Sequence, residues 1–527
     1  MRFLLLMWTM NPANAAEIRL SPGDSIQNAM NAAVGGDVIV LESGTWEEDL
    51  STEVDGSEDN PITVRAAEDA TVVITASGEV IQIDHAHWTF ANIIFDGQYG
   101  LANTIDIGDG AHHLTMTQIE VRHSGRDCVD MGAPSSVLIE ESEIHHCLGW
   151  NSDDDEPEDA HAITGGAAQD LVIRNTAIHT FSGDGIHFDA SRRAPGWNNI
   201  TIEDCEIWLE PLEEDTNGFP AGSVPGRNGV TTKTYPDGER AVLTIQDTTV
   251  YGFKEGIGGG TQAAFLMKEN IDATLRRIHV HDSSIAFRIR GATDARPTEP
   301  WVQIENVLMY DSSTGIRYED EIRNLNIIHT TFGQSIDNMF SSLDAEGAEI
   351  NVRNSLFMTD ELPAQTGAGM ANQTATTDDF ADADGGDYHL IETSTAIDAG
   401  IEISGIDTDL DGMERIVGDA PDLGPYEYGA EAWDTGTSED TGVDADTADP
   451  DGDDPGGTTG DDTGTTETPP PGDPGVGAAE HVGEKGGCGC ATSNRPAGNA
   501  LLILMALLCI RRERIVKHCR SINFSFE

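Results

Sequence analysis

Short segments in which apolar and polar residues alternate recur through the body of the chain. They include LTMTQIEV, VLIEESEI, LVIRNTAI, ITIEDCEI, LTIQDTTV and VQIENVLM, which begin at residues 114, 137, 171, 200, 243 and 302. Alternation with a period of two and many β-branched residues is typical of β-strands. Most of these segments also carry Asn, Asp, Gln or Glu near the centre. The pattern predicts one such strand in every repeat unit, with loops of unequal length between units.

A second kind of strand follows in each unit, with sequences such as VIQID, TIDIG, CVDMG, AITGG, GIHFD, GVTTK, GIGGG and GIRYE. Aligned on the first inward apolar residue, they give Ile81, Ile105, Val129, Ile163, Ile186, Val230, Ile257 and Ile316, and Ile285 of SIAFR fits between the last two. Units that cannot bury a face alone must stack. We therefore expect an all-β chain folded as a parallel β-helix. Two packed antiparallel sheets are the alternative, but they would not keep side chains in register over so many units.

Both ends of the body carry recognisable segments. Residues 1–15 have one Arg, a short apolar run and a small-x-small end, which fits a signal peptide cleaved before Ala16. A buried N-terminal strand is the alternative. The stretch SIQNAMNAA that follows favours a short helix with Ser25 as N-cap, which would cover the first coil.

The opening IQNAMNAAVGGDVIVLESGTWEEDL, followed by NPITVRAAEDATVVI, resembles the start of secreted right-handed parallel β-helix proteins. These include the pectate lyase and chondroitinase B-like polysaccharide lyases. The resemblance implies a right-handed β-helix over residues 16–360 and specifies the fold better than the activity. DYHLIETSTAIDAG, DTDLDGMER and APDLGPYEY resemble the closing segment of bacterial surface β-helix proteins, which we expect over residues 361–429.

The C-terminal part changes composition abruptly. Residues 430–485 are rich in Asp, Thr, Gly and Pro, and such low hydropathy with high charge predicts a disordered linker. Residues 486–514 contain Cys488 and Cys490, the run ALLILMALLCI and an Arg cluster. The layout resembles the C-terminal sorting tags of myxobacterial surface proteins, which implies processing at Cys488 or Cys490 and display at the outer cell surface. A tail disulfide or a weak metal site is the alternative. Residues 515–527 extend beyond the usual end of such a tag.

Charge restricts the partners. The chain has 29 basic and 93 acidic residues, a formal net charge of −64, which excludes a nucleic-acid backbone as a partner and disfavours anionic membrane surfaces. We expect membrane association only through the processed tail, and a monomer. The body has three cysteines, so it is no disulfide scaffold. Cys128 and Cys147 either form a bridge between adjacent coils or remain free buried thiols.

The outward positions of the second strands form columns along the predicted helix. Because neighbouring strands lie about 4.8 Å apart, we expect Asp189 and Lys233 to be adjacent and Arg288 to lie about two strands further on. Asp130 and His187 would line the same face. The longest insertion, LEPLEEDTNGFPAGSVPGR, falls between Asp189 and Lys233, and long loops on consecutive coils commonly build walls around a site.

These residue types suit β-elimination on a uronate. That reaction removes a proton α to a carboxylate, whose charge must be neutralised by Ca²⁺ or a guanidinium while a basic side chain takes the proton. The strand VTTKT is similar to the Lys-bearing strand of chondroitinase B-like lyases. The resemblance implies Lys233 as the base and Arg288 as the guanidinium, beside Asp189 and His187. The plain alternative is that Lys233 and Asp189 form an ordinary cross-strand ion pair.

Two groups of carboxylates are candidates for Ca²⁺, the only cofactor the sequence suggests. Asp184 and Asp189 of GDGIHFD are the first. The acidic loop WNSDDDEPEDAH is the second, but its spacing matches no calcium-loop motif, and a solvated acidic loop is the simpler interpretation.

A further outward column follows the first strands. It contains Arg122, His145, His179, Trp208, Tyr251, His281 and Tyr310. Aromatic side chains at coil spacing suit the apolar faces of sugar rings, so Trp208, Tyr251 and Tyr310, with Asp130 and Arg317, are candidate substrate-binding residues. Alternatively, the column packs under the long loops.

Three hypotheses for function follow. The first is a surface-displayed polysaccharide lyase that uses Lys233. The second is a noncatalytic protein that binds a glycan or a neighbouring cell through the same face. The third is a glycosidase, which needs two carboxylates such as Asp130 and Asp189 at a defined separation.

Overall fold

The computed structural model describes residues 15–190, 194–234, 239–254, 261–294 and 297–430. The predicted signal peptide, the acidic linker and the tail with Cys488 and Cys490 lie outside these ranges. No helix in the described ranges is long and apolar enough to span a membrane.

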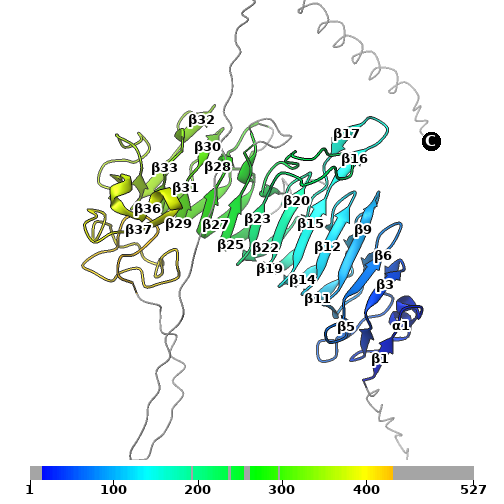
Figure 1. Cartoon of the computed structure of the whole chain (residues 1–527). Helices are drawn as coiled ribbons and strands as arrows, with labels where there is room; N and C mark the ends of the chain where they lie inside the picture. Colours follow the sequence, from blue (N-terminus) through cyan, green and yellow to red (C-terminus); the bar gives the residue numbers. More distant parts are fainter. Residues whose placement is uncertain (1–14, 191–193, 235–238, 255–260, 295–296, 431–527) are drawn as a thin grey trace, which may run out of the picture. The chain divides into compact units, whose positions relative to one another are not determined.

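The described chain is an all-β, right-handed parallel solenoid of about 12 turns, as the sequence predicted (Figure 1). Three rows of strands run along it. The first row consists of β1 (Glu17–Leu20), β2 (Val38–Leu41), β5 (Ile62–Ala66), β8 (Trp88–Ala91), β11 (His112–Thr117), β14 (Ser135–Glu140), β19 (Gln169–Arg174), β22 (Asn198–Glu203) and β33 (Ile350–Arg353). It also takes the first halves of four long strands, which are β25 (Ala241–Tyr251), β27 (Ile271–His281), β29 (Trp301–Met309) and β31 (Leu325–Phe332).

The second row takes the other halves of those long strands, which join the two rows into one 22-stranded sheet. Its remaining strands are β3 (Gly44–Glu47), β6 (Val72–Thr75), β9 (Ile94–Gly100), β12 (Glu120–Ser124), β15 (Glu143–Cys147), β20 (Ala177–Phe181), β23 (Glu206–Trp208), β34 (Leu356–Phe357) and β35 (Gln373–Thr374). A bend separates the two rows in every coil.

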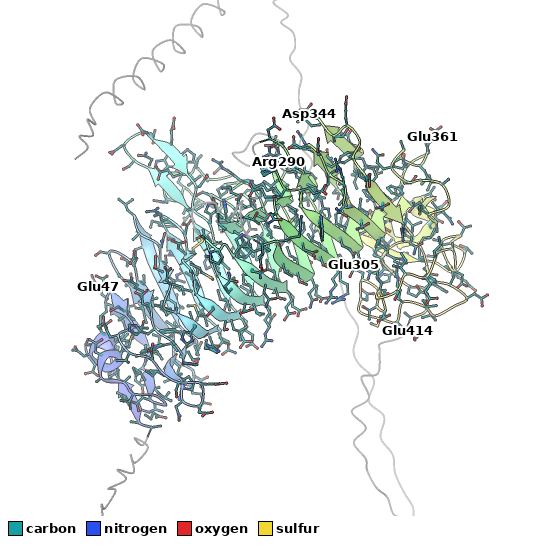
Figure 2. The ribbon with its side chains drawn as sticks, turned by 180° about the vertical axis from the view of Figure 1, so that it is seen from behind. Glu47, Arg290, Glu305, Asp344, Glu361 and Glu414 are labelled. Carbon is teal, nitrogen blue, oxygen red and sulfur yellow. A yellow bond between two sulfur atoms is a disulfide. The ribbon has the colours of Figure 1, made fainter. Side chains whose placement is uncertain are left out.

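The third row is a separate 11-stranded parallel sheet and corresponds to the second strands of the sequence pattern. It contains β4 (Leu50–Ser51), β7 (Ile81–Ile83), β10 (Ile105–Ile107), β13 (Val129–Met131), β18 (Ile163–Gly165), β21 (Ile186–Asp189), β24 (Val230–Lys233), β26 (Ala263–Lys268), β28 (Ser283–Arg290), β30 (Ser312–Glu319) and β32 (Asn338–Leu343). In Figure 2, which shows the molecule from behind, Arg290 on β28 of this sheet lies near the upper edge, and Glu305 on β29 of the 22-stranded sheet lies lower in the view.

The predicted register of the third row holds from Ile81 to Val230 and then changes. Val230 pairs with Phe265, Phe265 with Phe287, and Phe287 with Ile316. Ile257 lies outside the described residues, and the alignment on Ile285 was wrong, because Ile285 pairs with Ala263 and Thr314. A slip of two residues leaves every side chain on its predicted face, so alternation alone cannot detect it.

Polar residues in the left-handed conformation form the bend between the first and second rows. They are Asn92, Gln118, Glu141, Asn175, Asp204, Asp247, Arg277, Asn306, His329 and Asn354, with φ between 47° and 56°. These residues include the mid-unit Asn, Asp, Gln and Glu of the repeat. Asn and Asp tolerate this conformation better than other side chains, which explains their place in the pattern.

The two ends of the solenoid are covered. Helix α1 (Ile26–Ala32) begins at the predicted N-cap Ser25, whose side chain accepts a hydrogen bond from the Asn28 amide, and it buries Ile26 and Met30. At the other end a second core includes Phe380, Tyr388, Leu410, Leu423 and Tyr426, packed on Leu308 and Leu356 of the solenoid. This segment contains η1 (Thr377–Asp379), β36 (Phe380–Asp382), η2 (Ala383–Gly385) and β37 (Asp387–Leu390).

One disulfide joins neighbouring coils. Cys128 and Cys147, 19 residues apart in sequence, are bonded, with their Cα atoms 5.6 Å apart. Cys205 is a free buried thiol, and burial raises its pKa to about 12. The structure therefore selects the bridge between the two interpretations that the sequence left open for Cys128 and Cys147.

Candidate active site

A pocket of about 590 Å³ lies on the outer face of the third row, over β10, β13, β18, β21 and β24. It brings together four residues predicted from the sequence, namely Asp130, His187, Asp189 and Lys233. The small residues Gly108, Gly132, Gly165 and Gly166 lie between them and leave the sheet face open. The remaining polar residues of the lining are Asp106, Asp109, Asp127, Asp159, His161 and Thr164.

His187 stands between two carboxylates in this pocket. Its Nδ1 lies 2.9 Å from Asp184 Oδ2, off the line of a hydrogen bond, and its Nε2 lies 3.8 Å from Asp189 Oδ2. Asp184 is buried, and its Oδ1 accepts hydrogen bonds from the backbone and side-chain nitrogens of Asn228 at 3.1 and 2.7 Å. Burial alone would raise the pKa of Asp184, but His187 and Asn228 outweigh it and hold that pKa well below its usual range.

The predicted calcium pair is therefore divided by an imidazole. A Ca²⁺ ion shared by Asp184 and Asp189 would have to displace His187. Nδ1 of the nearby His161 already accepts a hydrogen bond from the Asp184 amide at 2.7 Å, so this nitrogen is also in use. Calcium binding remains a prediction that these contacts do not favour.

The acidic loop after β15 forms a hairpin of β16 (Gly149–Asn151) and β17 (Glu156–Glu158). The Asn151 side chain accepts hydrogen bonds from the amides of Asp153 and Asp154, and the acidic residues of the turn are exposed. This arrangement agrees with the simpler interpretation of a solvated acidic loop.

Lys233 forms the cross-strand contact that the sequence predicted. Its Nζ donates a hydrogen bond to Asp189 Oδ2 at 2.8 Å, and the two side chains are 32% and 34% exposed. The Lys233 ammonium already forms an ion pair with the Asp189 carboxylate, so it has no free lone pair with which to accept a proton. Lys233 is thus well placed to bind or to donate a proton, and less well placed to accept one.

Lys268 is the residue that sequence reasoning missed. The pairing of Thr231 with Leu266 places Lys268 on β26 beside Lys233, in the same outward column. Lys268 is 9% exposed, and burial, with a contribution from Lys233, lowers its pKa to about 8. The prediction had assigned GIGGG to this coil, whereas the strand is the apolar run AAFLMK that follows it. That run, ending in a lysine, was the available signal.

Three arginines on β28 and β30 converge on one buried carboxylate. Glu319 Oε1 lies 2.9 Å from Arg288 Nε and 2.6 Å from Arg317 Nε, and Oε2 lies 3.1 Å from Arg290 Nε. Burial would raise the pKa of Glu319, but the guanidiniums outweigh it and lower that pKa. Arg288 was predicted in the column of Lys233, and this is corrected, because Arg288 pairs with Arg317 in the neighbouring column. We call Lys233, Lys268, Arg288, Arg290 and Arg317 the basic cluster.

The charged lining of the pocket is mostly acidic, and of the basic cluster only Lys233 belongs to that lining. Asp106 and Asp130 are direct neighbours on β10 and β13. Asp130 accepts hydrogen bonds from Thr164 Oγ1 and, at 3.2 Å, from Asn103 Nδ2. Burial, with the neighbouring Asp130 carboxylate, raises the pKa of Asp106 to about 6. Asp106 can thus hold a proton at a pH at which exposed aspartates have lost theirs.

The predicted aromatic column lies on the second row as a continuous stack of rings. His145, His179, Trp208, Tyr251, His281 and Tyr310 follow one another, with centroid separations between 4.3 and 6.0 Å and interplanar angles of 16° or less. Each inner ring has both neighbours against its faces. Trp208 and Tyr251 therefore offer edges, and Tyr310, the last ring of the stack, has Tyr388 beside it at 5.5 Å with an interplanar angle of 35°. These contacts favour a structural role over the predicted sugar-stacking surface.

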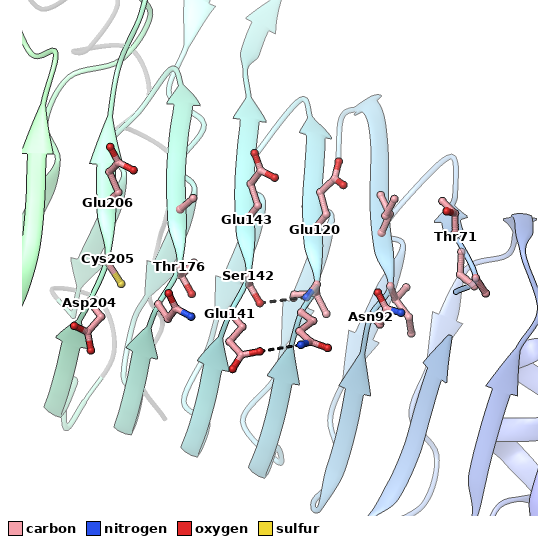
Figure 3. A pocket seen from close by; sticks show the side chains of 18 of the residues that line it. Thr71, Asn92, Glu120, Glu141, Ser142, Glu143, Thr176, Asp204, Cys205 and Glu206 are labelled. Atoms are coloured by element: carbon pink, nitrogen blue, oxygen red, sulfur yellow. Dashed lines mark hydrogen bonds between the residues drawn. The ribbon is translucent and has the colours of Figure 1, made fainter. Parts of the chain in front are cut away.

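A larger groove of about 1070 Å³ follows the bend between the first and second rows (Figure 3). Its acidic lining comes from the coils of β12, β15 and β23 and consists of Glu120, Glu141, Glu143, Asp204 and Glu206, with Asp247 on the next coil, while the coil of β20 contributes Asn175, Thr176 and Ala177. None of its lining residues is a lysine or an arginine. It lacks the mixed chemistry of the third-row pocket, which is therefore the candidate active site.

No protein-family model and no curated protein matches the chain. Several solved structures are similar. Pectate lyase Pel9A has a TM-score of 0.43 and 15% identity over 79% of this chain and 97% of its own. A rhamnogalacturonan lyase has a TM-score of 0.43 and 12% identity over 68% and 86%. The A-module of the mannuronan C-5 epimerase AlgE6 of Azotobacter vinelandii has a TM-score of 0.41 and 12% identity, over 64% of this chain and 94% of its own. The assignment of the β-solenoid rests on the strand pairing itself.

Proposed function

We propose that this protein is a carbohydrate-active β-solenoid of the cell surface that cleaves a uronate-containing polysaccharide by β-elimination. The observation that carries the proposal is the basic cluster. In a chain of net charge −64, five cations gather on adjacent strands of one sheet face, and one of them, Lys268, has a pKa near 8. Lys268 lies beside Lys233 at the edge of the pocket, and strongly perturbed groups at such places are candidates for acid–base chemistry.

The reaction needs three tasks, and the cluster has groups for each. A guanidinium of Arg288 or Arg317 neutralises the uronate carboxylate, which makes the proton on C5 more acidic. Neutral Lys268 takes that proton, the C4–O bond breaks as the C4–C5 double bond forms, and the leaving oxygen needs a proton. The Lys233 ammonium, one strand away at about 4.8 Å, supplies it. Lys268 thus replaces Lys233 as the proposed base, and Lys233 becomes the acid.

The surroundings fit a polymer. The face is open along several coils, as an extended glycan requires, and the aspartates of the pocket can receive neutral hydroxyl-bearing sugars through hydrogen bonds. Export to the cell surface through the predicted signal and tag belongs to the same proposal, and the Cys128–Cys147 disulfide supports it, because disulfides persist in oxidising compartments.

The test is a screen of uronate polymers for the ultraviolet absorbance of new unsaturated ends, with and without Ca²⁺. Lys268→Met and Lys233→Met should each lower kcat by at least about 100-fold, the usual range for acid–base groups. The matched control is Lys254→Met, because Lys254 forms a comparable ion pair with Asp282 at 2.7 Å outside the pocket. The control should keep wild-type kcat. Binding of a polymer without any unsaturated product would contradict the lyase and support the noncatalytic alternative.

One observation favours a second candidate, a glycosidase. Glycoside hydrolysis uses one protonated and one ionised carboxyl group, and Asp106 with a pKa near 6 beside Asp130 provides such a pair. This pair replaces the predicted pairing of Asp130 with Asp189, which is engaged by Lys233. Hydrolysis would produce saturated reducing ends without ultraviolet absorbance, and Asp106→Asn would abolish it, whereas Lys268→Met would not.

A further inference from the structure

Three histidines meet at the turn between the third and first rows, on two adjacent coils. His87 directly precedes β8, and His112 and His113 begin β11. One ligand nitrogen of each lies within 4.8 Å of those of the other two. Nδ1 of His112 lies 2.9 Å from Nδ1 of His113, and the rings of His87 and His113 stack at 4.7 Å.

The backbone creates this arrangement. Consecutive residues of an extended strand point to opposite sides, but His113 has φ of 52° and breaks that alternation next to His112. His87 has φ of 58° and occupies the equivalent position one coil earlier, where its amide donates a hydrogen bond to the His112 carbonyl at 2.9 Å. Neighbouring coils of the solenoid therefore hold all three side chains in place.

The chemical surroundings of these imidazoles differ from those of six other histidines of the described chain. Six histidines lie within ion-pair distance of a carboxylate, namely His123, His145, His179, His187, His281 and His389. Within the described ranges, no ion pair joins a carboxylate to His87, His112 or His113. The described residues contain two groups of side chains whose ligand atoms lie close enough to hold a metal ion, and this group is the one made of imidazoles alone. Their nitrogens face one another, an arrangement that is unfavourable when they are protonated and favourable around a cation.

We propose that His87, His112 and His113 bind a divalent transition ion, with Zn²⁺ as the representative. Neutral imidazole suits Zn²⁺, Cu²⁺ and Ni²⁺, whereas Ca²⁺ and Mg²⁺ prefer oxygen ligands. Zinc sites with three histidines leave a fourth position for water. Zn–N bonds of about 2.0–2.1 Å in tetrahedral geometry place ligand nitrogens about 3.3 Å apart, so a small movement of the half-exposed side chains is enough.

The site is separate from the basic cluster and from the proposed lyase chemistry. A bound ion would link the turn before β8 to the start of β11, so metal binding should stabilise the folded solenoid by mass action. This stabilisation can be measured without any substrate, so the test of the metal site does not depend on the proposed lyase function.

The experiment is a titration of the metal-free full chain with Zn²⁺ and, for spectroscopy, with Co²⁺. Wild type should bind one more tight equivalent than the double variant His112→Ala/His113→Ala. The single variant His87→Ala should weaken that equivalent by at least the roughly 10–100-fold that loss of even an outer partner costs. The matched control is His85→Ala, because His85 lies two residues away and contacts Thr52 instead of the three imidazoles.

Unchanged stoichiometry and affinity in the double variant would overturn the proposal, as would an equal loss in His85→Ala. Thermal unfolding of the metal-free variants separates loss of the site from loss of the fold, since their midpoints should match metal-free wild type. Zn²⁺ should raise the midpoint of wild type more than that of the double variant. Co²⁺ bound at Cys488 and Cys490 would show a thiolate charge-transfer band, and the double variant would keep it.

Discussion

Lys268 illustrates a conflict between stability and chemistry at a single residue. Its folded-state pKa of about 8 lies below the ordinary 10.5, so the unfolded chain binds more protons between these two pH values. The stability of wild type therefore rises with pH through this window, and below pH 8 the full cost of burying the charge is present. Because burying the Lys268 ammonium lowers the stability of the fold, a purely structural role does not explain why a lysine occupies this position.

We therefore expect Lys268→Met to stabilise the protein at pH 7 by as much as about 3 kcal/mol, from 1.36 kcal/mol per pKa unit. The same variant should lose lyase activity. Denaturant unfolding of both proteins at several pH values measures the difference, which should shrink as pH rises from 8 to 10.5. A destabilised Lys268→Met, with a difference that does not depend on pH, would show that the ammonium serves packing.

Glu319 presents the opposite case, because its charge is required by three guanidiniums. Removing one partner of a buried ionic group typically costs about 3–5 kcal/mol, and Glu319→Gln keeps the shape, so we expect a loss of about 2–4 kcal/mol at pH 7. The lowered folded-state pKa adds stability above about pH 4.5 that is lost as pH falls through the folded value. The gap between wild type and Glu319→Gln should therefore close in acid.

The control for this prediction is Glu321→Gln. Glu321 pairs with Arg323 at 3.6 Å, but both side chains are more than 60% exposed, so the change should cost less than about 1 kcal/mol. Equal effects of the two substitutions in urea unfolding would mean that the arginines on β28 and β30 do not depend on Glu319.

The individual site residues were predictable only as far as the register was. Asp130, His187, Asp189 and Lys233 could be placed on one face because short strands with an apolar residue on each side leave a single alignment. Lys268 could not be placed in this way, because the Gly-rich sequence before β26 resembles the strand sequences of earlier coils and was aligned in place of β26. Arg288 was misplaced by two residues, a slip that keeps the inward face apolar and leaves no trace in the sequence.

At the scale of the elements, the left-handed bend is the feature that repeats most strictly. Asn175 has φ of 47°, and its side chain is exposed, so its identity matters through the backbone. We expect Asn175→Val to cost about 1–2 kcal/mol, because a β-branched side chain is strained there, and Asn175→Gly to stay within about 0.5 kcal/mol. Thermal unfolding measures both.

The matched control is Thr201→Val on the adjacent strand β22, where the backbone is extended and valine is well tolerated. It should stay within about 0.5 kcal/mol of wild type. If Asn175→Val lowers the stability by no more than Thr201→Val does, the left-handed bend does not restrict the type of side chain at this position. The sequence predicted polar residues at this position, but the bend itself and the joining of two rows emerge only from the pairing.

For the whole molecule, the solenoid could be predicted because stacking is the only way for such short units to bury their apolar faces. The activity could not be predicted in the same way, since it depends on which outward positions of neighbouring coils carry charge. A chain of net charge −64 repels an anionic polymer at a distance, whereas the proposed function requires the basic cluster to attract the carboxylates of that polymer at contact.

Salt should separate these two effects. Raising ionic strength from about 0.01 to 0.15 M shortens the Debye length from about 30 to 8 Å, which screens the distant repulsion more than contacts inside the pocket. We therefore expect KM for a polyuronate to fall over this range while kcat stays constant, the reverse of the usual behaviour of a cationic site. A methyl-esterified form of the same polymer carries no charge and should bind without this trend. A KM that rises steadily from the lowest salt would mean that the basic cluster controls association even at long range.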